Sequence, residues 1–415
     1  MKKLLMVCVL LATELGVAAT VSGDEQKLLR QVPGVFARSA GQYKLLLANL
    51  EKVATEQKPF PKRWENGELV TIAPEDWCSG FFPGSMWYLY EYTKDAYWRE
   101  QAAKFTAVQE RVRHYTGNHD IGFMLMTSVG NALRLDPRPE YPGLLLDGAE
   151  ALTKRYSEKL GLIRSWGKID DEKNFLVIVD NLMNLELLEW ASKNGGGEKY
   201  AQIAKKHADN TNRHHFREDG SAYHVLNYNQ KTPGKLQEIR AGQGASVEGT
   251  WARGHSWAIY GYTMLYRETK ERAYLMRAIR AADYLLETAN VPADGVPYWD
   301  HKAFAIPHEE RDASAAAVET SALLELSQFL PAEKGGVYRA FAVKTLLSLC
   351  SDAYFAKPGA NGGFLLLHSV GSKPRFIETG KGGEVDMPLN YADYYFLEAL
   401  VRFCNLTAGR TALSR

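Results

Sequence analysis

The sequence has few cysteines, and they form no recognisable pattern. Only four occur in 415 residues, and no two of them have the CxxC spacing. Cys8 lies in the N-terminal apolar run, and the remaining three, Cys78, Cys350 and Cys404, cannot all pair with one another. We therefore expect neither a disulfide framework nor a cysteine-based zinc site.

The chain also lacks an excess of charge of either sign. Its 50 Lys and Arg residues face 49 Asp and Glu residues, a net charge of +1, which argues against nucleic acid as a partner. After the N-terminus no stretch stays apolar over the roughly 18 residues that suggest a membrane-spanning helix. No linker rich in proline, glycine or serine divides the chain. We expect one domain over residues 20–415 that is soluble and has no membrane partner.

The N-terminus has the layout of a targeting segment. Lys2 and Lys3 precede an apolar run that extends to about Ala19, and small and polar residues follow. This order is typical of a secretory signal peptide, although Glu14 interrupts the run. We predict that residues 1–19 are a signal peptide and that the mature chain is exported to the periplasm.

Helical periodicity dominates the rest of the chain, with apolar residues recurring at intervals of three and four. The predicted helices are 39–56, 84–94, 96–115, 121–135, 141–159, 178–192, 198–216, 255–269, 271–290, 313–330, 336–355 and 390–405. Strand-like alternation is scarce, and only 222–228 and 363–370 suggest strands of a hairpin.

Every second predicted helix is more apolar than its neighbours and follows a cluster of polar, aromatic and glycine residues. These clusters are residues 76–82, 118–123, 179–181, 249–254, 309–312 and 386–391. The alternation predicts an all-α (α/α)6 toroid of six helical hairpins, with the clusters meeting at one end of the inner helices. An open helical solenoid would show the same alternation, but it needs polar capping repeats, and the last helix here is strongly apolar.

Two aspartates near these clusters stand out as candidate acids. Asp120 begins an apolar helix, where aspartate commonly caps the backbone. Asp180 lies between the apolar stretches 175–179 and 182–185, so its carboxyl should be desolvated and its pKa raised, as a general acid requires. A buried helix cap is the alternative explanation for Asp180.

The residues around the two aspartates suit a sugar. Two carboxyls beside a sugar-sized pocket are the general arrangement of glycoside hydrolysis, aromatic rings stack on pyranoses, and arginine pairs with carboxylates. The candidates are Trp77, Trp166 and Trp257 as platforms, Arg253 and Gln243 for a substrate carboxylate, and His224 for a hydroxyl. Core packing explains any one of these histidines or tryptophans equally well.

Six motifs in a fixed order carry a more specific signal: DWCSGFFPG, NHDIGF, IRSWG, IVDNLMNL, DGSAYHVLNY and GTWARGHSWAIYGY. In this combination the chain resembles the unsaturated glucuronyl hydrolases of glycoside hydrolase family 88 from about residue 40 to 405. The resemblance implies an (α/α)6 barrel that uses no metal or other cofactor. It also implies oligosaccharide substrates that polysaccharide lyases release, with a 4,5-unsaturated uronic acid at the non-reducing end.

The resemblance further implies roles for individual residues. Asp180 matches the general acid and base, which protonates C4 of the enol ether and then helps water to attack C5. Asp120 matches a second essential carboxylate. The positions that match the substrate subsite are His119, Trp77, Trp166, His224, Gln243, Arg253 and Trp257.

The chain departs from the family pattern at Ser79 and His255, so we expect the +1 side or the pocket wall to differ there. Ser369, Ser372 and Lys373 resemble a patch that some members use to bind a sulfate group, which would favour sulfated glycosaminoglycan disaccharides. A surface turn explains these three residues equally well.

Three other functions remain open at this point. An unsaturated rhamnogalacturonyl hydrolase that acts on pectin fragments would share the toroid and the chemistry. A non-catalytic glycan-binding toroid would keep the tryptophans but would not need both aspartates. A purely structural helical scaffold would not explain the clustering of Trp, Arg and Asp.

Overall fold

The computed structural model describes residues 21–380 and 382–413. The predicted signal peptide, residues 1–19, lies outside this range. No helix within the described residues is long and apolar enough to cross a membrane.

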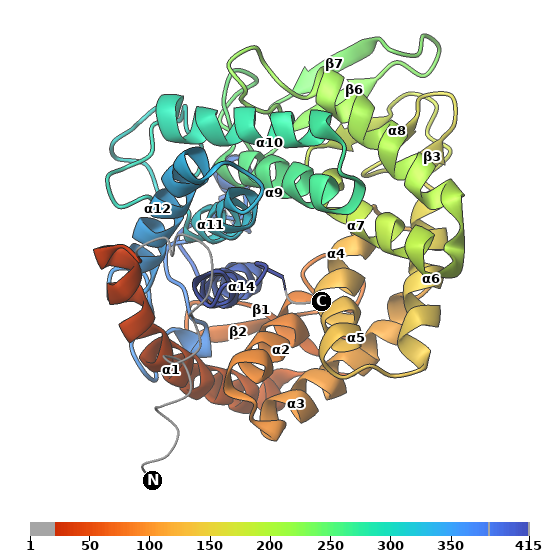
Figure 1. Cartoon of the computed structure of the whole chain (residues 1–415). Helices are drawn as coiled ribbons and strands as arrows, with labels where there is room; N and C mark the ends of the chain where they lie inside the picture. Colours follow the sequence, from red (N-terminus) through yellow and green to blue (C-terminus); the bar gives the residue numbers. More distant parts are fainter. Residues whose placement is uncertain (1–20, 381, 414–415) are drawn as a thin grey trace.

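Two concentric rings of helices make up the fold (Figure 1). The outer ring contains α1 (Gly23–Val53), α3 (Ala96–Ala107), α6 (Glu140–Thr153), α8 (Glu198–His214), α10 (Arg272–Asp283) and α12 (Ala332–Leu349). The inner ring contains α2 (Phe81–Thr93), α4 (Ile121–Leu125), η2 (Met126–Gly130), α5 (Asn131–Leu135), α7 (Asn181–Ala191), α9 (Ala252–Thr269), α11 (Ala313–Ser327) and α14 (Asn390–Thr407). Each inner helix contacts the next, and α14 contacts α2, so the ring closes. The (α/α)6 toroid is confirmed.

The two rings differ in how much of each helix is buried. Along α11 every residue from Ala313 to Leu326 is buried, as expected for a helix that has neighbours on all sides. Helix α8 instead buries one stripe, at Tyr200, Ala204, His207, Ala208 and Thr211, and exposes its charged face. The alternation of apolar and amphipathic segments along the chain is therefore the alternation of inner and outer helices.

Strands occupy short connections between the helices. They form two antiparallel pairs, β1 (Phe60–Glu65) with β2 (Glu68–Ile72) and β3 (Tyr156–Ser157) with β4 (Leu162–Ile163). A three-stranded antiparallel sheet has the order β5 (Leu176–Ile178), β6 (Val225–Tyr228), β7 (Leu236–Arg240). The remaining short elements are η1 (Val108–Val112), η3 (Ser192–Gly196), η4 (Tyr284–Thr288), η5 (Asn361–Gly363) and α13 (Lys373–Thr379).

Three expectations about local structure need correction. The stretch 222–228 does contain β6, but 363–370 makes only isolated bridges. There the carboxylate of Asp393 accepts the backbone N–H groups of Leu365 and Leu366 at 2.9 and 3.0 Å, so a side chain takes the place of a partner strand. Helix α1 begins far before residue 39, because the chain stays helical through Pro33, and α13 was not expected.

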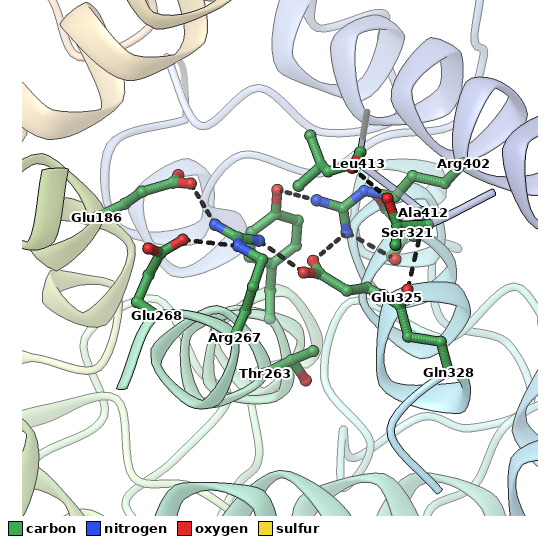
Figure 2. Close-up of polar contacts among 12 residues, drawn as sticks. Glu186, Thr263, Arg267, Glu268, Ser321, Glu325, Gln328, Arg402, Ala412 and Leu413 are labelled. Carbon is green, nitrogen blue, oxygen red and sulfur yellow. Dashed lines mark hydrogen bonds and ion pairs between the residues drawn. The ribbon is translucent and has the colours of Figure 1, made fainter. Parts of the chain in front are cut away.

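A buried network of charged side chains joins four inner helices (Figure 2). Arg267 of α9 pairs with Glu186 of α7, with Glu268 at 2.8 Å and with Glu325 of α11 at 2.7 Å. Arg402 of α14 pairs with the second oxygen of Glu325 at 3.0 Å. Removing one partner of such a buried pair leaves an uncompensated charge, so single substitutions in the network should destabilise the closed ring.

Candidate active site

Two aspartates stand at the N-termini of inner helices without capping them. Asp120 precedes α4 and Asp180 precedes α7, and neither side chain accepts a hydrogen bond from its helix. Asp312, in the same place before α11, does cap, since it accepts from the backbone of Ser314 and Ala315. The helix-cap explanation for Asp120 and Asp180 is therefore wrong.

Both carboxyls instead line a cavity of about 350 Å³ at the end of the toroid where the inner helices begin. Such a volume is within the range of small-molecule sites. The lining residues are Lys62, Trp77, Asp120, Trp166, Ile178, Asp180, Gln243, Trp251, Arg253, Gly371, Ser372, Arg375, Gly382, Glu384 and Tyr391. They come from both halves of the chain and from five of the six hairpins.

The packing of α4 against α7 holds the two aspartates near each other. The backbone N–H of Phe123 donates to Asn184 Oδ1 at 2.8 Å. Gly122 lies so close to α7 that a Cβ atom there would be 2.5 Å from the Cα of Asn184. Any larger side chain at this position would separate the two helices and with them the two carboxyls.

Burial changes the acidity of both groups. It raises the pKa of Asp180 to about 7, against the opposing charge of Arg253. The pKa of Asp120 is also raised, first by burial and then by the negative charges of Asp180 and Asp76. Because two buried carboxyls cannot easily ionise together, the site keeps a proton near neutral pH, which a general acid requires.

Two histidines lie behind the aspartates. His119 Nε2 is 3.2 Å from Asp120 Oδ1, and His224 Nε2 is 3.8 Å from Asp180 Oδ1. Burial lowers the pKa of each histidine to about 3, so both are neutral at physiological pH. Neither lines the cavity, and both lie against the carboxyls instead of facing the open space.

Several predicted residues do meet at the cavity. Trp77 and Trp166 line it with half-buried rings, and Gln243 and Ser372 line it beside them. The Gln243 amide also donates to the carbonyl oxygen of Gly371 at 2.7 Å. Gly371 thereby lies over one side of the site, with Arg375 and Glu384 beside it.

Trp257 needs correction as a sugar platform. Its side chain has no exposed surface, and it packs edge-on against Phe123 and Tyr395, with ring centroids 5.2 Å away in each case. Trp257 lies one helical turn after Arg253 on α9. Its side chain is therefore below the floor of the cavity. Trp257 is therefore a core residue of the inner ring.

Arg253 needs a partial correction. It lines the cavity, but its guanidinium already donates to Asp312 at 3.1 Å and to the carbonyl oxygens of Val370 and Gly371. The Arg253 guanidinium, which was expected to bind a substrate carboxylate, therefore links residues 370–371 to the start of α11. Its charge still acts on Asp180.

The expected sulfate patch is not assembled. Ser369 is fully buried, and the Lys373 ammonium pairs with Glu309 at 2.5 Å and with Glu310. Two carboxylates beside one ammonium leave a net negative charge, which repels sulfate. Only Ser372 of the three lines the cavity.

The two departures from the family pattern do not alter the cavity. Ser79 is fully buried and its hydroxyl accepts from Gln109 Nε2 at 3.3 Å. His255 points toward the outer ring, where its Nε2 lies 2.9 Å from the carbonyl oxygen of Ala281. Neither residue belongs to the cavity wall.

Eight lining residues were absent from the predicted site: Lys62, Ile178, Trp251, Gly371, Arg375, Gly382, Glu384 and Tyr391. Lys62 of β1 pairs with Glu384 at 3.2 Å, which ties two distant segments together at the rim. Trp251 and Tyr391 belong to clusters that mark inner-helix starts, so their place in the sequence was a usable signal. Nothing near Lys62 or Glu384 in the sequence distinguishes them from surface charges.

Comparisons with known proteins agree with this geometry. The sequence model for Glycosyl Hydrolase Family 88 matches residues 49–268. An unsaturated glucuronyl hydrolase of Formosa agariphila is 42% identical over 82% of this chain and 83% of its own. An unsaturated chondroitin disaccharide hydrolase of Streptococcus agalactiae is 31% identical over 84% of this chain and 86% of its own.

The same family includes close structural matches. The crystal structure of an unsaturated glucuronyl hydrolase specific for heparin superposes with a TM-score of 0.82 at 39% identity, and the match covers 90% of this chain and 97% of that one. The resemblance found in the six motifs is thereby confirmed. The chain belongs to glycoside hydrolase family 88 and is a glycosidase.

Proposed function

We propose that this enzyme removes the 4,5-unsaturated glucuronic acid from the non-reducing end of glycosaminoglycan oligosaccharides that lyases have released. One observation carries the proposal: Asp120 and Asp180, whose side chains cap no helix, are both buried at one cavity that tryptophan and tyrosine rings also line. The names of the relatives and structural neighbours support this substrate class.

The reaction is the hydration of a vinyl ether. Protonated Asp180 gives its proton to C4 of the C4=C5 double bond, and positive charge develops at C5, where the ring oxygen stabilises it. The Asp180 carboxylate then accepts a proton from water as the water oxygen bonds to C5. The product is a hemiketal, which opens and releases the second sugar, so the balance is the addition of one water molecule.

The remaining cavity residues bind and orient the sugar. The half-buried rings of Trp77 and Trp166 offer faces for the unsaturated ring. Asp120, next to Asp180, is placed to hold a hydroxyl and to stabilise positive charge at the reacting ring.

The structure bears on the choice between sulfated and unsulfated substrates. Since Lys373 is paired with two glutamates, the Ser369–Lys373 segment provides no cation for a sulfate group. We expect unsulfated disaccharides to be processed at least as well as sulfated ones. We also propose the periplasm as its compartment, from the predicted N-terminal signal peptide.

The test is to incubate the protein with unsaturated disaccharides from chondroitin, hyaluronan, heparin and pectin, and to separate the products. Release of the second sugar from a glycosaminoglycan disaccharide supports the proposal. Release from the pectin disaccharide alone would favour an unsaturated rhamnogalacturonyl hydrolase. Binding without any release would indicate a glycan-binding protein.

A further inference from the structure

His224 lies where three strand ends meet. Asp180 follows the end of β5, His224 precedes β6, and Gln243 follows the end of β7. Because neighbouring strands in this sheet are antiparallel, these three ends share one edge. Val225 pairs with the last residue of β5 on one side and the last residue of β7 on the other. The sheet therefore fixes His224 between Asp180 and Gln243.

The contact with Gln243 determines which ring nitrogen of His224 carries the proton. The backbone N–H of Gln243 donates to His224 Nδ1 at 2.9 Å. A nitrogen that accepts a hydrogen bond has no proton, so this contact favours the neutral tautomer with its proton on Nε2, against the Ala241 backbone, which favours a proton on the ring nitrogen that it meets. Gly242 makes this approach possible, because its φ is +61° and a Cβ atom there would lie 2.3 Å from Nδ1.

The protonated nitrogen faces the proposed acid. His224 Nε2 is 3.8 Å from Asp180 Oδ1, and both atoms are buried without a hydrogen-bond partner among the described residues. A buried donor and a buried acceptor left unsatisfied are costly, and a hydrogen bond between them needs a movement of less than about 1 Å. Catalytic hydrogen bonds are often long in free enzymes and shorten in the substrate complex.

We propose that His224 is a positioning residue whose Nε2–H donates a hydrogen bond to the Asp180 carboxylate when that group has given its proton to the substrate. The proposal rests on the proposed function and adds a role to it. The Nε2 proton stays on the histidine throughout. The proton that reaches C4 comes from Asp180, and the proton from water returns to Asp180.

The other charged groups around Asp180 come from different elements. Arg253 on α9 favours its ionised form, and Asp120 before α4 is coupled to it, since the negative charge of Asp180 raises the pKa of Asp120. His119 lies behind Asp120 and is neutral. A substitution at His224 changes none of these groups, so a change in the acidity of Asp180 would report the lost N–H donor.

Two matched variants isolate that donor. In His224→Asn the side-chain oxygen can still accept from Gln243, but no N–H reaches Asp180. In His224→Gln the amide N–H extends to about the place of Nε2 and can still donate. The pH dependence of kcat is measured for both variants and wild type on an unsaturated chondroitin disaccharide, and thermal melting confirms that each is folded.

A lost donor to the charged form raises the pKa of the acid. We expect the alkaline limb of kcat in His224→Asn to move up by about one pH unit, with a plateau about tenfold lower, and His224→Gln to keep the limb of wild type. An equal loss of kcat at every pH in both variants would overturn the proposal and leave His224 a packing residue. A wild type inactive on all disaccharides would overturn the proposed function and this role with it.

If His224→Asn does not fold, Gly242→Ala provides the second perturbation, since its methyl group would displace His224 from the Gln243 N–H. The same upward movement of the limb is expected. An unmoved limb in a folded Gly242→Ala protein whose activity is reduced would contradict the proposal.

Discussion

The raised pKa of Asp180 makes a prediction about stability as well as catalysis. A carboxyl that is more basic in the folded than in the unfolded chain binds its proton more tightly when folded. Its contribution to stability is complete below about pH 4, the ordinary pKa of aspartate, and it is lost as the pH rises toward 7, the folded value. Replacing Asp180 with asparagine removes the free-energy cost of ionising this buried carboxyl at high pH.

The magnitude follows from the size of the shift. A pKa raised from 3.8 to about 7 corresponds to about 4 kcal/mol of differential free energy between the folded and unfolded chains. Relaxation around the site and the mismatch of the new amide reduce this gain. We expect Asp180→Asn to exceed wild type in unfolding free energy by about 2 to 4 kcal/mol at pH 8, and by much less at pH 4.

Guanidinium unfolding at several pH values between 4 and 8 measures this difference. The buried histidines also make stability depend on pH, but they are common to both proteins. Asp120 does not cancel, because loss of the Asp180 charge lowers its raised pKa and adds to the gain of the variant at high pH. Two parallel curves would refute the reasoning, because they would mean that Asp180 ionises as easily in the folded protein as in the unfolded one.

Three further predictions follow from the placement of other side chains. Lys373→Ala should leave the ratio of kcat/KM for sulfated over unsulfated disaccharides unchanged, because the charge of Lys373 is already paired. A lower ratio in steady-state kinetics would show that Lys373 binds the sulfate group. Trp257→Ala should cost about 3 to 5 kcal/mol of unfolding free energy, whereas Trp166→Ala should raise KM and cost little stability; the reverse pattern in denaturation and kinetics would contradict their assigned places. Arg402→Met should destabilise by about 3 to 5 kcal/mol in chemical denaturation, since it removes one of the two arginines that pair with buried Glu325 and the arginine that pairs with buried Glu398, and an unchanged midpoint would show that Arg402 contributes nothing to stability.

The sequence predicted the architecture because burial dictates composition. Inner helices such as α11 are surrounded and must be apolar on every side, whereas outer helices such as α8 need one apolar stripe. Asp180 was recognised for the same reason, since a lone carboxyl between apolar residues has to be desolvated. Such signals lie within one stretch of the sequence, so they can be recognised without any knowledge of the fold.

What the sequence could not predict depends on distant contacts. Arg253 and Trp257 are one turn apart on the same helix, and nothing in their spacing shows that the cavity floor lies between them. The charge of Lys373 is cancelled by Glu309 and Glu310, far away in the chain. Lys62 enters the site because β1 lies beside the segment that carries Glu384. These outcomes are set by tertiary packing.

The central claim is that Asp180 protonates the double bond of an unsaturated uronyl sugar. The most direct test follows the ultraviolet absorbance of that conjugated double bond with wild type and with Asp180→Asn, whose folded state the denaturation curves establish. We predict that wild type removes the absorbance and that the variant is slower by at least about a hundredfold, the lower range for loss of a general acid. A folded variant that removes the absorbance at the rate of wild type would contradict the account.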